Sequence, residues 1–238
     1  MLNDKSKKRV LAIVPAYNEQ DNIVSTIEDL RKNAPEVDYV IINDGSTDNT
    51  LEVCEEHGFN TISLPVNSGL ACGFQTGMQY ALMHDYDYAV QFDADGQHAA
   101  EFIQAMLDLA ENENLDIVIG SRFKTQKKPK TNPRMIGSIL ITRMILWTTR
   151  IRISDPTSGM RLFNKRMIKL FAHESDFSPE PDTIAHVARN GAKIDEIQVE
   201  MRERTAGTSY LNISRSIAYM LRVCISILFV QWFRKKNQ

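Results

Sequence analysis

The sequence predicts an α/β fold in which helices cover both faces of a mostly parallel sheet. In the first half of the chain, short apolar runs alternate with longer stretches of helical spacing, and this alternation is typical of repeated strand–helix units. The first apolar run, residues 10–14, contains no polar residue, as expected of a parallel strand that is buried on both faces. The length of 238 residues predicts one domain, or one domain with an appendage.

Short polar turns separate the expected elements. Strands are expected at residues 10–14, 39–42, 61–65, 88–92 and 116–119. Two helices are expected from apolar residues at helical spacing, one with Ile23, Ile27 and Leu30 and one with Leu70, Phe74 and Met78. Four more are expected at residues 49–57, 99–111, 134–150 and 183–189. The polar, basic and proline-containing segment 124–133 predicts a loop.

The turn after the fourth expected strand carries two carboxylates, Asp93 and Asp95, and the amide of Gln97. In an open α/β sheet, ligands collect beyond the carboxyl ends of the strands, where this turn lies. Carboxylate and amide oxygens are ligands that Mg²⁺ and Mn²⁺ prefer. The turn therefore predicts a metal site, although two aspartates alone also fit an ordinary solvated turn.

Composition and simple motifs exclude several classes of protein. A formal net charge of −2 argues against a nucleic-acid-binding protein that relies on overall positive charge. The three cysteines are far apart, so neither a disulfide framework nor a zinc site is predicted, and a reducing cytoplasm fits best. No Gly-x-Gly-x-x-Gly or Gly-x-x-x-x-Gly-Lys-Ser/Thr motif occurs, which disfavours dinucleotide-binding and P-loop proteins. Pro15 interrupts the short N-terminal apolar run, so no signal peptide is expected.

Carboxylates also follow the first two expected strands, at Glu19 and Asp44. In such a position a carboxylate can accept a hydrogen bond from a ribose hydroxyl or a pyrimidine N–H, and Tyr17 can pack on a base. Both carboxylates equally suit the capping of a following helix. Each residue taken alone leaves the two interpretations open.

Four short motifs stand at the ends of the expected strands. They are Pro-Ala-Tyr-Asn-Glu at 15–19, Asn-Asp-Gly-Ser at 43–46, Asp-Ala-Asp at 93–95 and Gly-Ser-Arg at 120–122. A fifth, Asp-Pro-Thr-Ser-Gly-Met-Arg, occupies residues 155–161. In their order and spacing the first four resemble family-two inverting glycosyltransferases, and the fifth is similar to the motif of the dolichyl-phosphate mannose synthase branch. The resemblance covers residues 8–210 and implies the GT-A fold and a uridine or guanosine diphosphate sugar as donor.

The resemblance also implies roles for individual residues. The residues that it assigns to the nucleotide are Pro15, Ala16, Tyr17, Glu19, Asp44, Gly69, Asp93 and Ala94. The residues that it assigns to a Mg²⁺ or Mn²⁺ ion and the diphosphate are Asp93, Asp95 and Gln97. The family often has Asp where Asn43 stands, so Asp44 is the expected partner of the base.

The second half of the chain is expected to bind the acceptor. Arg134 and Ser138 lie four residues apart, on one side of the expected helix, and the resemblance implies that such a pair binds the phosphate of a lipid acceptor. Arg122 and Arg204 stand where further phosphate-binding residues are expected, and the arginine fork suits phosphate oxygens. The branch typically has Lys where Tyr210 stands, which weakens this interpretation, so a hydroxyl acceptor stays open.

The acceptor decides whether a catalytic base is needed. A sugar hydroxyl has to lose a proton as it attacks, and it needs a nearby carboxylate. A phosphate monoester, with a second pKa near ~6, is already largely ionised at neutral pH. Asp182 is the first candidate for a base and Glu180 the second. Both also suit the N-terminus of the helix at 183–189, where acidic residues are favoured.

The C-terminal segment 213–233 is largely apolar but contains Arg215 and Arg222. It lacks the uninterrupted run of about 18 to 20 apolar residues that a membrane span needs. Together with the basic tail at 234–236, it suits an amphipathic helix on an anionic membrane surface. A helix packed on the core or on a partner subunit is the alternative.

The predicted division of the chain follows from these features. A GT-A glycosyltransferase domain is expected at 1–211, with a nucleotide-sugar half at 1–122 and an acceptor half at 123–211. A membrane- or partner-associating helix is expected at 212–238. The expected location is cytoplasmic and peripheral, on the inner face of the cell membrane, and a homo-oligomer or a small membrane-protein partner is left open.

The sequence thus predicts an inverting, metal-dependent glycosyltransferase that moves a sugar from a nucleotide sugar to a polyprenyl phosphate. Two alternatives stay open: transfer to a hydroxyl of a lipid-linked cell-wall or capsular saccharide, and a catalytically inactive protein that binds a nucleotide sugar. A phosphatase with an aspartyl nucleophile is disfavoured. Its Asp-x-Asp motif usually ends the first strand, whereas Asp93 and Asp95 follow the fourth.

Overall fold

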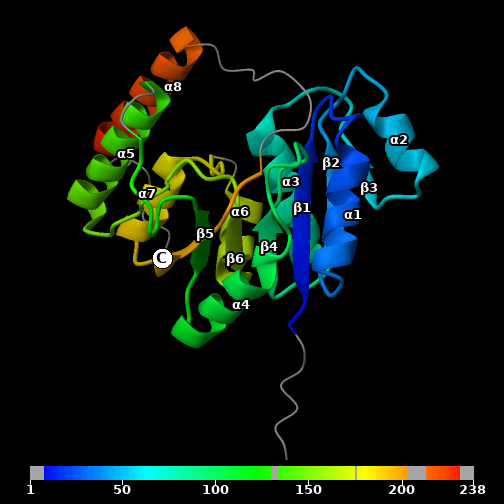
Figure 1. The fold of residues 1–238 in the computed structure, drawn as a ribbon, viewed down its shortest axis with the longest axis horizontal. Coiled ribbons are helices and arrows are strands. Elements are labelled where there is room, and N and C mark those ends of the chain that lie inside the picture. The colour runs from blue at the N-terminus through cyan, green and yellow to red at the C-terminus, as the bar shows by residue number, and fades with distance from the viewer. Residues whose placement is uncertain (1–7, 130–132, 175, 203–212, 231–238) are drawn as a thin grey trace, which may run out of the picture.

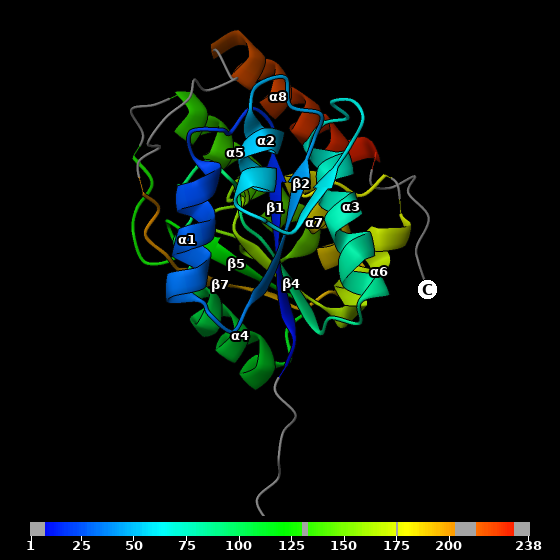
Figure 2. The same cartoon turned by 90° about the vertical axis from the view of Figure 1, so that its right-hand side faces the viewer.

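The computed structural model describes residues 8–129, 133–174, 176–202 and 213–230. Within these ranges the chain forms three layers, a central sheet with helices on both faces (Figures 1 and 2). One face is covered by α1 (Ile23–Asn33), α2 (Thr50–Glu56) and α4 (Phe102–Glu113). The other face is covered by α3 (Leu70–Met83), α5 (Pro133–Thr149), α6 (Lys165–His173), α7 (Pro181–Arg189) and α8 (Ile213–Ile225).

The sheet of the described residues is mixed and mostly parallel. Its strands are β1 (Val10–Ala16), β2 (Asp38–Asn43), β3 (Thr61–Ser63), β4 (Tyr88–Gln91), β5 (Ile117–Ser121), β6 (Arg161–Asn164) and β7 (Ile194–Gln198). Their order across the sheet is β3-β2-β1-β4-β6-β5-β7. Every neighbouring pair is parallel except the two that involve β6, which runs antiparallel to β4 and β5. The predicted α/β fold is confirmed.

Two strands, β6 and β7, have no clear signal in the sequence. Each is short, and each carries a charged residue that the fold buries, Arg161 in β6 (1% exposed) and Glu196 in β7 (4% exposed). A buried charge breaks the apolar pattern by which strands are recognised. The C-terminal helix α8 was expected, and it continues as a π-helical turn, η1 (Ser226–Val230). No helix in the described ranges has both the length and the apolar character that crossing a membrane requires.

The order of the strands determines where a ligand can bind. β1 lies between β2 and β4, so the chain changes from one side of β1 to the other between β3 and β4. A crevice opens at such a switch point, beyond the carboxyl ends of the strands. Asp44 directly follows β2, and its backbone N–H donates to the carbonyl oxygen of Ala16 at 2.9 Å, which joins the ends of β1 and β2. Asp93 follows β4 on the other side of β1.

Helix α3 packs closely on β1 at Gly77. A Cβ atom on Gly77 would lie 2.2 Å from Cγ2 of Ile13, which is fully buried in β1. Gly73, one turn earlier, has more room, because the nearest atom to its Cβ position is Cγ2 of Ile42 at 3.7 Å. The missing side chain at Gly77 therefore sets the distance between α3 and the sheet.

Replacing Gly77 by alanine is expected to lower the free energy of unfolding by ~1–3 kcal/mol, because the β-branched Ile13 side chain cannot leave a filled core. Gly73→Ala is the matched control, since the same change there gains up to ~1 kcal/mol of helix propensity without a clash. Urea unfolding of both variants measures the difference. A Gly77→Ala protein as stable as the wild type would contradict this packing.

Candidate functional site

A small cavity lies where β1, β2 and β4 end. Its volume is about 250 Å³, and it is lined by Pro15, Ala16, Tyr17, Glu19, Asp44, Leu70, Gly73, Asp93, Ala94 and Asp95. We call it the donor cavity. The structure brings together all the residues that the sequence assigns to the nucleotide except Gly69, which acts through its backbone on Asp44.

Asp44 is fixed at the edge of the donor cavity by two backbone N–H groups. Its Oδ1 accepts from the N–H of Ser68 at 2.7 Å, and its Oδ2 accepts from the N–H of Gly69 at 2.8 Å. Gly69 has a φ of +87°, a conformation that favours glycine. Each carboxylate oxygen has a second lone pair, so Asp44 can still accept from a nucleobase.

Glu19 both lines the donor cavity and supports the start of α1. Its Oε2 accepts from Nδ2 of Asn22 at 2.7 Å, and Asn22 is the N-cap residue of α1. Its backbone N–H donates to Oγ1 of Thr50 at 2.9 Å, which ties it to the first residue of α2. The Glu19 carboxylate thus contacts the side chain of the N-cap residue of α1 and also lines the donor cavity.

The turn that carries Asp93 is held by the buried side chain of His98. Because the Asp93 N–H donates to Nδ1 of His98 at 2.9 Å, this ring nitrogen carries no hydrogen. In the neutral ring the hydrogen lies on Nε2, which is 3.6 Å from Oδ2 of Asp93. Oδ1 of Asp93 accepts from Nε2 of Gln91 at 3.0 Å. These contacts orient a carboxylate whose side chain is still 34% exposed.

Asp95 is buried and folds back on its own loop. Its Oδ1 accepts from the N–H of Gln97 at 3.1 Å. The Thr26 hydroxyl donates to the carbonyl of Ala94 at 3.0 Å, which ties the same turn to α1. The side chain of Gln97 does not line the donor cavity, and its backbone carbonyl accepts from the N–H of Arg202 at 2.9 Å. A metal-binding role for Gln97 stays a prediction.

Asp93 and Asp95 suit a divalent cation that arrives together with a ligand. Both line the donor cavity, and carboxylates are the hard oxygen ligands that Mg²⁺ and Mn²⁺ prefer. Among the described residues, no group of three or more His, Cys, Asp or Glu side chains is placed to hold a metal ion. Ions of this kind usually bind through one or two carboxylates, with waters and substrate phosphates completing the shell. The donor set therefore fits a cation shared with a diphosphate.

Gly159 lies against Asp93 and belongs to residues 155–161, which we call the connecting segment. A Cβ atom on Gly159 would lie 2.4 Å from Oδ2 of Asp93 and 3.2 Å from Cε1 of His98. A side chain at this position would therefore require the Asp93 carboxylate to move. The hydroxyl of Ser158, the preceding residue, donates to the carbonyl of Gly120 and fixes the segment to β5.

The connecting segment ends in a buried cation, Arg161. Its Nη1 and Nη2 atoms donate to the carbonyl oxygens of Pro179 and Pro156. Burial lowers the pKa of Arg161, and the acidic groups around it, Asp155 and Asp93 among them, act in the opposite direction. The guanidinium therefore contributes positive potential near Asp93.

The start of the connecting segment meets two of the predicted acceptor-phosphate residues. Arg122 donates from Nε and Nη2 to the two carboxylate oxygens of Asp155, at 2.7 and 2.9 Å, and Asp155 is fully buried. Thr157 donates its hydroxyl to Oδ1 of Asp155 at 3.1 Å, and its Oγ1 lies 3.4 Å from Oγ of Ser138. Arg122 and Ser138 are thus brought together through the connecting segment.

The remaining acceptor-phosphate residues cannot be placed in the same way. The side chain of Arg134 lies outside the described residues, as do all atoms of Arg204 and Tyr210, so their roles stay predictions. Lys128, which the sequence patterns do not single out, joins the cluster by donating to Oγ of Ser138 at 2.7 Å. The only signal for it in the sequence is the density of basic residues in the loop at 124–133.

The two candidate bases contact the C-terminal helix. Nη2 of Arg222 in α8 donates to both carboxylate oxygens of Glu180, at 3.0 and 3.2 Å. The Ser226 hydroxyl in η1 donates to Oδ2 of Asp182 at 2.6 Å. Burial raises the pKa of Glu180, and Arg222 opposes this shift. These four residues line a cavity of about 690 Å³ that shares no lining residue with the donor cavity.

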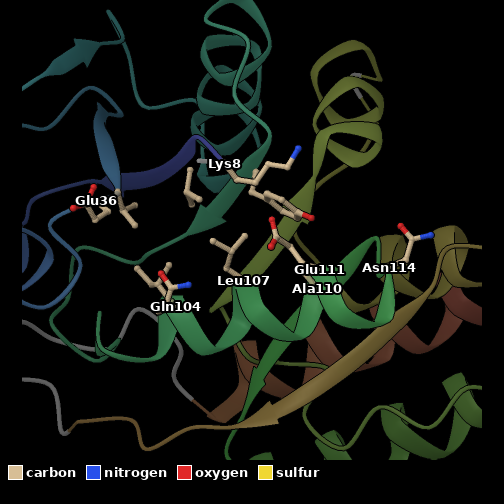
Figure 3. A pocket seen from close by; sticks show the side chains of 11 residues that line it. Lys8, Glu36, Gln104, Leu107, Ala110, Glu111 and Asn114 are labelled. Atoms are coloured by element: carbon tan, nitrogen blue, oxygen red, sulfur yellow. The ribbon is translucent and has the colours of Figure 1, made fainter. Parts of the chain in front are cut away.

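A further cavity, of about 610 Å³, lies beside α4 where β1 and β4 begin (Figure 3). Its wall mixes charges of both signs, from Lys8, Glu36 and Glu111, with apolar residues of α4. The strands carry their ligand-binding turns at the opposite ends, and none of the lining residues belongs to the donor cavity. This cavity is therefore separate from the candidate site.

Two relatives cover most of the chain. It is 30% identical over 218 residues to the undecaprenyl-phosphate mannosyltransferase of Micrococcus luteus, a match that covers 86% of this chain and 88% of that protein. It is 26% identical over 228 residues to the polyprenol monophosphomannose synthase of Mycolicibacterium smegmatis, with 91% and 86% covered.

The fold and the family model agree with these relatives. The fold is similar to that of a mannosyltransferase from Pyrobaculum calidifontis in complex with GDP-Man and Mn²⁺, with a TM-score of 0.67 and 18% identity over 98% of this chain and 67% of that one. Residues 11–171 match the model of glycosyl transferase family 2. This match spans more than half of the chain and includes the whole donor cavity. The chain therefore belongs to glycosyl transferase family 2, and it is a glycosyltransferase with a GT-A fold.

Proposed function

We propose that this enzyme transfers a sugar from a nucleoside diphosphate sugar to a polyprenyl phosphate, with inversion at the anomeric carbon. The connecting segment carries the proposal. Its Gly159 packs against Asp93 of the donor cavity, and its first residues contact Arg122 and Ser138. The connecting segment therefore links the donor cavity, which suits a diphosphate, to Arg122 and Ser138, whose basic and hydroxyl groups suit a phosphate. The relative from Micrococcus luteus is an undecaprenyl-phosphate mannosyltransferase, which supports the same class of acceptor here.

At the donor end, the proposal assigns the nucleoside to Tyr17, Glu19 and Asp44. The two carboxylates accept from the ribose and the base, and the tyrosine ring packs on the base. Asp93 and Asp95 would hold Mg²⁺ or Mn²⁺ together with the diphosphate. When bound, such a cation stabilises the negative charge that develops on the leaving diphosphate. The structure of the Pyrobaculum relative contains GDP-Man and Mn²⁺, a donor and an ion of these two classes.

At the acceptor end, Arg122 and Ser138 are proposed to orient the phosphate, and Arg134 and Arg204 to add positive charge. An oxygen of the phosphate forms the new bond to the anomeric carbon while the bond from that carbon to the diphosphate oxygen breaks. The monoester is already ionised at neutral pH, so no proton has to be removed during attack.

Asp182 and Glu180 are therefore not required as bases in this mechanism. Their hydrogen bonds to Ser226 and Arg222 suit a structural role, in which they hold the C-terminal helix against α7. A hydroxyl acceptor would instead need one of them to accept a proton. This difference separates the two kinds of acceptor experimentally.

The proposal predicts that an Asp182→Asn, Glu180→Gln double variant still transfers sugar to polyprenyl phosphate. A general base is worth ~10²–10⁴-fold in rate, so kcat within about threefold of the wild type shows that no base is used. Ser226→Ala is the matched control, because it removes the hydrogen bond to Asp182 without changing the carboxylate. A loss of about 100-fold or more in the double variant, with an active Ser226→Ala protein and an unchanged melting temperature, would contradict the proposal. Transfer by the wild type to a lipid-linked saccharide but not to polyprenyl phosphate would do so as well.

We further propose that α5, α8 and η1 attach the enzyme to the inner face of the cell membrane. Most of the exposed large apolar side chains among the described residues lie on these elements: Ile136, Leu140, Leu146, Trp147, Leu221, Ile225 and Phe229. α5 and α8 lie side by side (Figure 1). A Cβ atom on Gly137 would lie 1.5 Å from the sulfur of Met220, so the Met220 side chain of α8 packs directly on this glycine of α5. An apolar face of this kind binds at the bilayer interface, where a polyprenyl acceptor resides. The expected boundary at residue 212 stays a prediction.

A Trp147→Ser, Phe229→Ser double variant is expected to lose binding to vesicles that contain phosphatidylglycerol. Burial of each aromatic side chain is worth ~1.5–3 kcal/mol, so the bound fraction in a flotation assay should fall by about tenfold or more. Met83→Ser is the control, since Met83 is an apolar residue of α3 that is 81% exposed away from these helices. Equal flotation of the wild type and the double variant would contradict attachment by this surface.

A further inference from the structure

Lys128 belongs to a group with Arg122, Ser138 and Thr157, which we call the acceptor cluster. It lies in the loop between β5 and α5, and its side chain is half-buried. The Nζ atom donates to Oγ of Ser138 at 2.7 Å and to Oγ1 of Thr142 at 3.2 Å, both on α5. It also lies 5.4 Å from the centre of the Phe123 ring. The ammonium is therefore held in a defined position and does not extend freely into solvent.

The charge of Lys128 is not neutralised by a direct ion pair within the described part of the chain. Its two hydrogen-bond partners there are both hydroxyls. The neighbouring cations do form ion pairs, Arg122 with Asp155 and Lys124 with Asp195. Burial lowers the pKa of Lys128, Asp155 and Glu196 oppose this shift, and Arg122 adds to it. A half-buried cation among hydroxyl groups is a suitable partner for an anion.

The hydrogen bonds in this cluster have a fixed direction. An ammonium group can only donate, so Oγ of Ser138 has to accept from Lys128 and must direct its own hydrogen elsewhere. The hydroxyl hydrogen of Thr157 is used on Asp155, so Thr157 can only accept from Ser138. The Ser138–Thr157 contact is 3.4 Å long, which makes it a weak hydrogen bond. The Ser138 hydroxyl can therefore give up this weak hydrogen bond and donate to an incoming anion at little cost in free energy.

We propose that Lys128 selects a phosphate monoester as the acceptor, by donating to the phosphate with its third N–H and by orienting the Ser138 hydroxyl toward the same group. This inference rests on the proposed transfer to polyprenyl phosphate. The position of Lys128 is consistent with that reaction. Lys128 contacts Ser138, which lies beside Thr157, and Thr157 is two residues from Gly159, which packs on Asp93. Lys128 thus acts on acceptor binding and not on the donor.

The test compares Lys128→Met with Lys127→Met in the full-length enzyme, with Mn²⁺, the wild-type donor and a short-chain polyprenyl phosphate in detergent micelles. A hydrogen bond to a charged group is worth a factor of about 10 to 100, so Lys128→Met should raise the KM for the polyprenyl phosphate by that factor. The donor KM should stay unchanged. Lys127 is exposed, and Lys127→Met should behave as the wild type. Lys128→Arg should restore most of the acceptor affinity, because it restores the charge.

A double-mutant cycle tests the orienting role. Since Ser138 and Lys128 act on one phosphate as a unit, the Lys128→Met, Ser138→Ala protein should show a smaller rise in acceptor KM than the product of the two single effects. Melting temperatures and the donor KM report whether the variants fold.

The outcomes separate this inference from the proposed function. A wild type that uses polyprenyl phosphate, with an unchanged acceptor KM in Lys128→Met, would overturn the role of Lys128 and leave the proposed function standing. A raised donor KM with an unchanged acceptor KM would also overturn it, because Lys128 would then belong to the donor side. A wild type without transfer to polyprenyl phosphate would overturn both.

Discussion

The close contact between Gly159 and Asp93 is the constraint on which the rest of the site depends. A Cβ atom on Gly159 would lie 2.4 Å from Oδ2 of Asp93, so any side chain at this one position would displace the Asp93 carboxylate. The same short segment reaches Arg122 and Ser138 through Asp155 and Thr157. The spacing between the donor cavity and the acceptor cluster is therefore set by a few covalently linked residues and not by the relative motion of separate elements.

Buried charges keep the connecting segment in place. Asp155 is fully buried, and it is compensated by the paired hydrogen bonds from Arg122. The buried Glu196 of β7 accepts from the backbone N–H groups of Ser154 and Asp155. Displacing the segment would leave the buried Asp155 and Glu196 carboxylates without these hydrogen bonds, and an unpaired buried charge is strongly unfavourable. Arg122, which we propose to orient the acceptor phosphate, thus also helps to determine the local fold.

The fold and the donor cavity could be predicted from the sequence because their signals are local. Asp44 and Asp93 stand just beyond apolar strands, and parallel strands bring such turns to one edge of a sheet. The roles of Lys128, Arg161 and Arg222 could not be predicted, because each depends on contacts between distant residues. Arg222 contacts Glu180, which is 42 positions away in the sequence. β6 was missed because its first residue is the charged Arg161, which interrupts the apolar pattern of a buried strand. The fold class and the family were correctly predicted, whereas the individual site residues stay predictions.

We propose that Asp93, positioned by Gly159, helps to hold a cation shared with the diphosphate of a nucleotide. The most direct test is the melting temperature of the wild type and of Gly159→Ala with GDP or UDP, each with and without Mn²⁺. A ligand that binds only the native state raises the melting temperature. The wild type should show a larger rise with nucleotide and Mn²⁺ together than with either alone. Gly159→Ala should lose that Mn²⁺-dependent part, measured against its own ligand-free value. Equal Mn²⁺-dependent shifts in both proteins, or none in the wild type, would contradict the account.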